Sequence, residues 1–133
     1  MYFSKEEILT ANDLQYEDVP VPEWGPDKLV RIRSLTAEER DEFEVFMSRV
    51  ASGLEQANVR AHLAALTLVD SEGKRLFSVA EAPVLGQKNA QALQRVWLAS
   101  IKLSGIARKS VEEALEDFPA GPSTASSTDS ASS

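Results

Sequence analysis

Residues 22–43 read PEWGPDKLVRIRSLTAEERDEF, and this stretch contains the signals that decide the fold. Apolar residues and arginines alternate over residues 30–33, which is the period of a β-strand with one buried face. Thr36 precedes Glu39 by three residues, and this capping-box spacing predicts the start of a helix. A strand that is followed at once by a helix indicates a fold that contains both.

A second alternating segment lies just upstream, at residues 16–21, where Val19 and Val21 take the apolar positions. Pro20 cannot donate a ladder hydrogen bond, so we expect this strand at the edge of a sheet. Residues 23–27, EWGPD, carry turn chemistry between the two strands. The simplest joining is therefore an antiparallel hairpin.

The rest of the chain predicts mainly helices. The longest is expected over residues 37–55, with an apolar face formed by Phe43, Met47, Val50 and Leu54. A second amphipathic stripe follows a break at residues 56–58 and consists of Val59, Leu63, Leu66 and Val69.

Shorter signals complete this pattern. Residues 70–73 indicate a turn, and residues 74–77 a short strand or an extended connector. Further helices are expected at residues 6–11, between Ser78 and Gly86, at residues 89–104 with a stop at Gly105, and at residues 110–118.

These elements predict an α+β fold, a mainly helical single domain with a small antiparallel β-hairpin near the N-terminus. The globular domain is expected to span residues 1–118. Residues 119–133 contain six Ser, two Thr and one charge, with no large apolar side chain to offset the entropy of ordering them. We expect them to form a disordered Ser/Thr-rich tail.

Composition and charge exclude several classes of function. The chain has no cysteine, which excludes disulfides, thiolate metal sites and cysteine nucleophiles. The formal net charge of −7 disfavours association with a phosphate backbone, so nucleic acid is not expected as a partner. Nowhere do eighteen apolar residues run uninterrupted, so no membrane association is expected either.

The sequence offers no convincing catalytic, cofactor or metal site. His62 is the one histidine, and its place between apolar helix positions favours a packed or surface side chain over a general base. Residues 70–73, DSEG, begin like a calcium loop but lack the later ligands. The six glycines match no phosphate-binding spacing. We therefore expect a protein that is not an enzyme and has no cofactor.

Aromatic residues suggest where a protein partner could bind. Trp24 stands between two prolines and either covers the hairpin or anchors an interface, and the sequence leaves both readings open. Phe46 widens the apolar face of the long helix beside Phe43 and Met47. These four residues are the candidate partner-binding set, whereas Trp97, on a strong apolar stripe, is expected in the core.

The order of the segments resembles the tail assembly chaperones of long-tailed, siphovirus-type bacteriophages and prophages. The segments that carry the resemblance begin with a short acidic helix, which VPEWG and VRIRSLTAEERDEF follow. Next come AALTLVDSEGKRLF, LG and LQRVWLASIKLSG, and their order and spacing are similar to those of the family. The resemblance covers about residues 4–118. It rests on the order of these segments, because each one alone is ordinary turn and cap chemistry.

This resemblance implies a noncatalytic protein that binds the tape measure protein and helps recruit tail tube subunits during tail morphogenesis. The major tail tube protein and self-association remain open as further partners. Such a chaperone is expected in the host bacterial cytoplasm and not in the mature virion. The alternatives are a structural tail or head–tail connector component of the virion and a bacterial adaptor domain.

Overall fold

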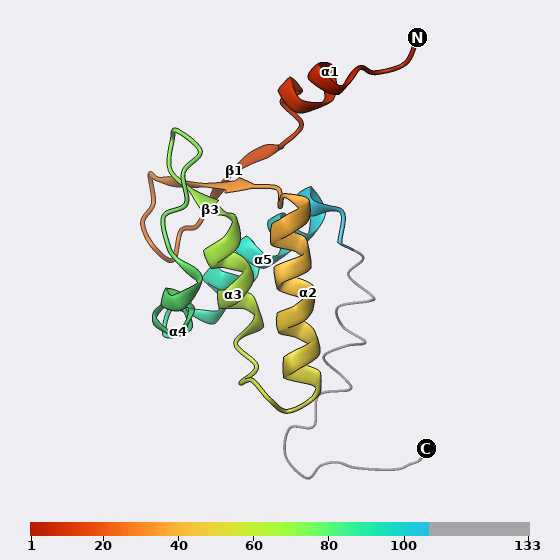
Figure 1. Ribbon diagram of the computed structural model, residues 1–133. Coiled ribbons are helices and arrows are strands. Elements are labelled where there is room, and N and C mark those ends of the chain that lie inside the picture. The colour runs from red at the N-terminus through yellow and green to blue at the C-terminus, as the bar shows by residue number, and fades with distance from the viewer. Residues whose placement is uncertain (107–133) are drawn as a thin grey trace, which may run out of the picture.

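The computed structural model describes residues 1–106, and its sheet contains three antiparallel strands in the order β1-β2-β3 (Figure 1). β1 (Tyr16–Pro20) pairs with β2 (Leu29–Arg33), and Tyr16 lies opposite Arg33. β2 also pairs with the two-residue strand β3 (Leu68–Val69). The predicted hairpin is confirmed, and β1 lies at the sheet edge, where Pro20 costs no ladder hydrogen bond.

Helices form the remainder of this described part. They are α1 (Lys5–Thr10), α2 (Ala37–Ala51), α3 (Val59–Thr67), α4 (Ala82–Leu85) and α5 (Ala90–Ser104). A 3₁₀ turn, η1 (Val79–Glu81), directly precedes α4. α3 is the central helix, because it contacts α2, α4 and α5. Every residue of α3 except Arg60 is buried, which matches its run of alanines and leucines.

Buried side chains form two clusters around α3. One joins the sheet to α4 and α5 and includes Ile32, Leu68, Leu85 and Val96. The other joins α2 to α3 and α5 and includes Phe43, Leu63, Leu66 and Trp97. Trp97 is only 3% exposed, so its predicted place in the core is confirmed.

The structure corrects the predicted ends of two helices. α2 ends at Ala51 rather than at residue 55, because Gly53 adopts a left-handed φ of 74° that an α-helix cannot continue. Leu54 consequently leaves the apolar face and is exposed. α3 ends at Thr67, so Val69 belongs to a strand instead of to the helical stripe.

Several local predictions are confirmed. Residues 70–73 form a turn in which the Asp70 carboxylate accepts hydrogen bonds from the amides of Glu72 and Lys74. Residues 74–77 are an extended connector with one isolated bridge, between Arg75 and Val69. α5 ends at Gly105, whose φ is 68°.

The fold class is confirmed as α+β, mainly helical, with its strands near the N-terminus except for β3. The predicted helix at residues 110–118, the domain boundary at residue 118 and the tail at residues 119–133 lie outside the described residues. Within residues 1–106, no helix is both long and apolar enough to cross a membrane.

Candidate functional site

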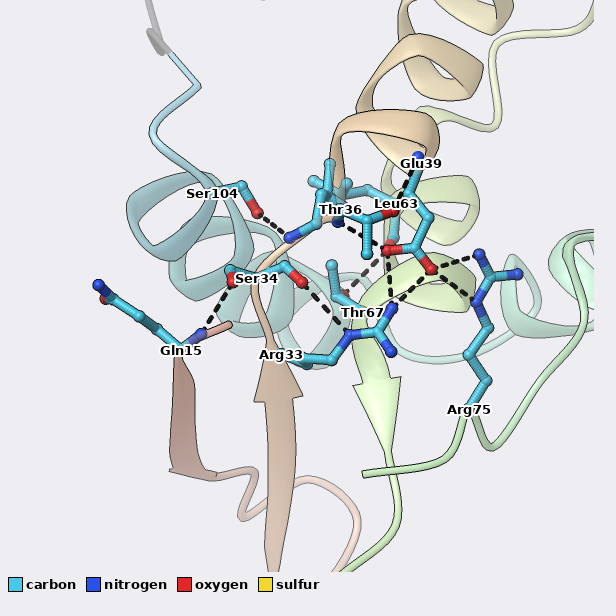
Figure 2. Close-up of polar contacts among 10 residues, drawn as sticks. Gln15, Arg33, Ser34, Thr36, Glu39, Leu63, Thr67, Arg75 and Ser104 are labelled. Carbon is cyan, nitrogen blue, oxygen red and sulfur yellow. Dashed lines mark hydrogen bonds and ion pairs between the residues drawn. The ribbon is translucent and has the colours of Figure 1, made fainter. Parts of the chain in front are cut away.

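A buried carboxylate holds the sheet, α2 and the connector after β3 together (Figure 2). Glu39 is 8% exposed and accepts hydrogen bonds from Arg33 Nη2 at 2.7 and 2.5 Å and from Arg75 Nη2 at 2.6 Å. It also accepts the Thr36 amide at 2.9 Å and so completes the predicted capping box. One side chain therefore caps α2 and joins it to β2 and to the chain segment that leads to Phe77.

The charge of Glu39 follows from these contacts. Burial by itself raises the pKa of a carboxyl group, but the hydrogen bonds from the Thr36 amide and from the guanidinium groups of Arg75 and Arg33 outweigh that effect. The pKa of Glu39 is therefore lowered from its ordinary value, and the group is ionised at neutral pH.

Hydroxyl groups make two further connections between elements. The Ser34 hydroxyl accepts the Gln15 amide at 2.9 Å, and the Ser104 hydroxyl accepts the Leu35 amide at 3.2 Å (Figure 2). In the core, Thr67 donates to the Leu63 carbonyl at 2.9 Å, and its hydroxyl lies 2.8 Å from that of Ser100. These bonds join the residues that flank β1 and β2 to each other, the segment between β2 and α2 to α5, and α3 to α5.

The loop that carries Trp24 is held in place by a turn at its start and by an ion pair to α5. The Trp24 amide donates to the Val21 carbonyl at 2.9 Å, and Val21 is 2% exposed. The carboxylate of Glu23 accepts two hydrogen bonds from Arg95 Nε, at 3.0 and 3.2 Å, and one from Arg95 Nη2 at 3.0 Å. The loop is thereby joined to α5, and these hydrogen bonds from Arg95 lower the pKa of Glu23.

Trp24 borders an open apolar groove of about 390 Å³, called here the Trp24 groove. Its other lining residues are Val30, Leu68, Leu76, Phe77, Val84, Leu85 and Lys88. Trp24 is 36% exposed, Leu76 51% and Val84 66%, so three large apolar side chains at this groove face solvent. Such a patch with a charged side chain at its margin is typical of a protein-binding surface.

Phe46 borders a second pocket, of about 600 Å³, with His62, Asn58 and residues of η1 and α4. The Phe46 and His62 rings stack with their centroids 3.9 Å apart and their planes at 15°. Burial lowers the pKa of His62, so this ring is neutral at pH 7. Its Nε2 atom is buried without a hydrogen-bond partner among the residues that the structure describes.

The four predicted partner-binding residues do not form one surface. Phe43 is 2% exposed and Met47 9%, and both belong to the core around α2 and α3. Trp24 and Phe46 instead border the two different pockets, and α4 is the wall between these pockets.

Leu76 and Val84 are the apolar groove residues that sequence reasoning missed. The sequence contained a weak signal for them, since both lie in short segments without a long apolar stripe that would bury them.

The described part of the chain offers few groups for chemistry. Residues 1–106 include no cluster of three His, Asp or Glu side chains placed to hold a metal ion. His62, the residue considered as a base, packs against aromatic rings and has no carboxylate or hydroxyl hydrogen-bond partner among these residues. Two pockets of this region are lined by residues of α4, and each is bordered by one of the exposed or half-buried candidate aromatic residues, Phe46 or Trp24.

Comparisons with known proteins give a likeness of fold. No protein-family model matches the sequence, and no curated protein matches it. Among solved structures, the tail assembly chaperone of bacteriophage HK97 is similar, with a TM-score of 0.56 and 19% sequence identity over 77% of this chain and 94% of that chain. The predicted resemblance to tail assembly chaperones is thus confirmed at the level of the fold.

Proposed function

We propose that this chain is a noncatalytic tail assembly chaperone that binds a tape measure protein and helps to recruit tail tube subunits. The observation that carries the proposal is the fold, which extends over 94% of the HK97 chaperone. In this proposal the protein acts in the cytoplasm of the host bacterium during tail morphogenesis and is not retained in the mature virion.

The surface supports a role in binding a helical client. An amphipathic helix binds by placing its apolar face in a hydrophobic groove, and the Trp24 groove offers exposed apolar side chains from the hairpin loop, the connector and α4. Tryptophan is the residue type most often found at binding hot spots. Glu23 and Arg95 hold the loop in place, so binding would lose little conformational entropy from the ordering of Trp24.

Phe46 supports the same role from the other side of α4. Its ring is half-buried on His62, and the adjoining pocket has walls from the segment after α2, from α3 and from α4. A client segment that reached both pockets would cross α4, which consists of only four residues.

The test is a pull-down of a tape measure protein. Trp24→Ala and Phe46→Ala should each weaken capture at least tenfold while circular dichroism shows an unchanged fold. Val45→Ala is the matched control, because Val45 is 61% exposed on α2 and lines neither pocket.

Different outcomes would overturn different parts of the proposal. In the first, the folded Trp24→Ala and Phe46→Ala variants capture the client at wild-type strength, which would refute the two pockets as the binding surface but leave client binding itself standing. In the second, the protein is recovered in purified virions as a stable ring, which would identify it as a tail or head–tail connector component. Genomic neighbours without tail genes would favour an adaptor domain.

A further inference from the structure

We infer that the N-terminal arm, defined as residues 1–13, docks in the Trp24 groove of a second copy of this chain. Every residue of the arm is exposed, and α1 contributes no buried side chain. The arm nevertheless presents Phe3 at 77%, Ile8 at 60% and Leu9 at 72% exposure. A segment with this much uncovered apolar surface is suited to contact with another chain.

The arm carries the local signals of a short helix. Ser4 and Glu7 make both hydrogen bonds of a capping box, at 3.1 and 2.8 Å. Phe3 and Ile8 occupy the positions of a hydrophobic staple, directly before the cap and four residues after it. Helices of six residues are not stable by themselves in water. Local capping specifies the helix, but a partner that covers its apolar residues is needed to stabilise it.

In the structure the arm does not cover the groove of its own chain. The arm is joined by residues 14 and 15 to the first residue of β1, whereas Trp24 follows the last residue of that strand. In Figure 1, α1 extends away from the body on the side opposite α4, which is a wall of the groove. In this arrangement the arm and the groove are both open to contact with another molecule.

Charge favours a second copy as the occupant. The arm contains three acidic residues, Glu6, Glu7 and Asp13, against Lys5. The segments that border the groove contain exposed Lys28, Lys74 and Lys88 against Asp27 and Glu81, while Arg75 is paired with Glu39 and Glu23 with Arg95. The acidic, apolar arm and the basic margin of an apolar groove are complementary, and both are present in every copy.

The arm and the groove are different surfaces, so two copies can exchange arms reciprocally in a dimer of two-fold symmetry. If the contact instead repeats head to tail, it generates a closed ring or an open helical assembly. A client helix that binds the same groove would have to displace the arm. The inference does not depend on the proposed function, since the arm and the groove are features of the chain alone.

Disulfide trapping tests the contact directly, because the chain has no cysteine of its own. Two single variants, Leu9→Cys and Val84→Cys, are mixed and oxidised. We expect a disulfide-linked heterodimer at least tenfold more abundant than in the control mixture of Leu9→Cys with Val45→Cys, which places the second thiol on exposed α2 surface away from the groove.

Light scattering of the full chain supplies an independent readout. The wild type should gain mass with protein concentration, and Leu9→Asp should stay a monomer. This substitution cannot unfold the body, because Leu9 is exposed in a segment that buries nothing. Trp24→Ala should raise the dissociation constant for self-association about 30-fold, as expected of a hot-spot tryptophan.

A monomeric wild type at every concentration would overturn the inference. Equal trapping at Val84 and Val45 would overturn it too. If Leu9→Cys is trapped only by the tape measure protein, the arm binds the client and not a second copy. That last result would leave the proposed function standing, whereas failed client capture with intact self-association would contradict only the proposed function.

Discussion

Replacement of Glu39 by alanine should destabilise the protein by about 3–4 kcal/mol. Removal of one partner from a buried ion pair costs about 3–5 kcal/mol, because the other charge stays buried and unpaired, and loss of a cap costs about 1 kcal/mol more. The Arg33 side chain is 12% exposed and will retain most of this penalty, whereas that of Arg75 is 31% exposed and can recover hydration. The sum of about 4–6 kcal/mol is therefore reduced by the hydration of Arg75, to about 3–4 kcal/mol.

The assay is urea unfolding at pH 7, followed by far-ultraviolet circular dichroism. Glu39→Gln keeps a side chain that can accept the Thr36 amide but removes the charge, so it should lose about 2 kcal/mol, between alanine and wild type. Glu44→Ala is the matched control on the same helix, since its pair with Arg40 is exposed and worth less than about 0.5 kcal/mol. A loss below about 1 kcal/mol for Glu39→Ala would refute the assigned role of this carboxylate.

Three further predictions follow from named contacts. The pKa of Glu39 is lower in the folded chain than its ordinary value of 4.5, so its stabilising contribution is complete above that pH and is lost as the pH falls; urea midpoints between pH 7 and pH 3 should fall less for Glu39→Gln than for wild type. Thr67→Val should cost about 1–3 kcal/mol in urea unfolding, because it leaves the buried Ser100 hydroxyl without its partner, and adding Ser100→Ala should recover part of that loss. Glu23→Gln should weaken the link from the loop to α5 and increase acrylamide quenching of Trp24. The change in fluorescence can be assigned to Trp24, because Trp97 is buried.

Local signals in the sequence predicted much of the fold. The capping boxes begun by Ser4, Thr36 and Ser78 all form, because both of their hydrogen bonds join residues three apart in the chain. The hairpin was predictable for a similar reason, since the alternation of its two strands and the turn between them lie within residues 16–33.

Features that depend on distant segments could not be predicted in this way. β3 contains two residues and continues an apolar helix, so periodicity cannot separate the strand from the helix. The sequence showed Glu39 as a cap, but the partner Arg75 lies 36 residues away, and only the fold brings the two side chains together. The Trp24 groove likewise needs Leu76 and Val84, which the fold brings beside the hairpin loop.

The most direct test of the chaperone role is the solubility of the tape measure protein when it is coexpressed with this chain. We predict that the wild-type chain moves the tape measure protein into the soluble fraction, and that Trp24→Ala, expressed at the same level and folded, does so poorly. A tape measure protein that remains equally insoluble with and without the wild-type chain would contradict the proposed function.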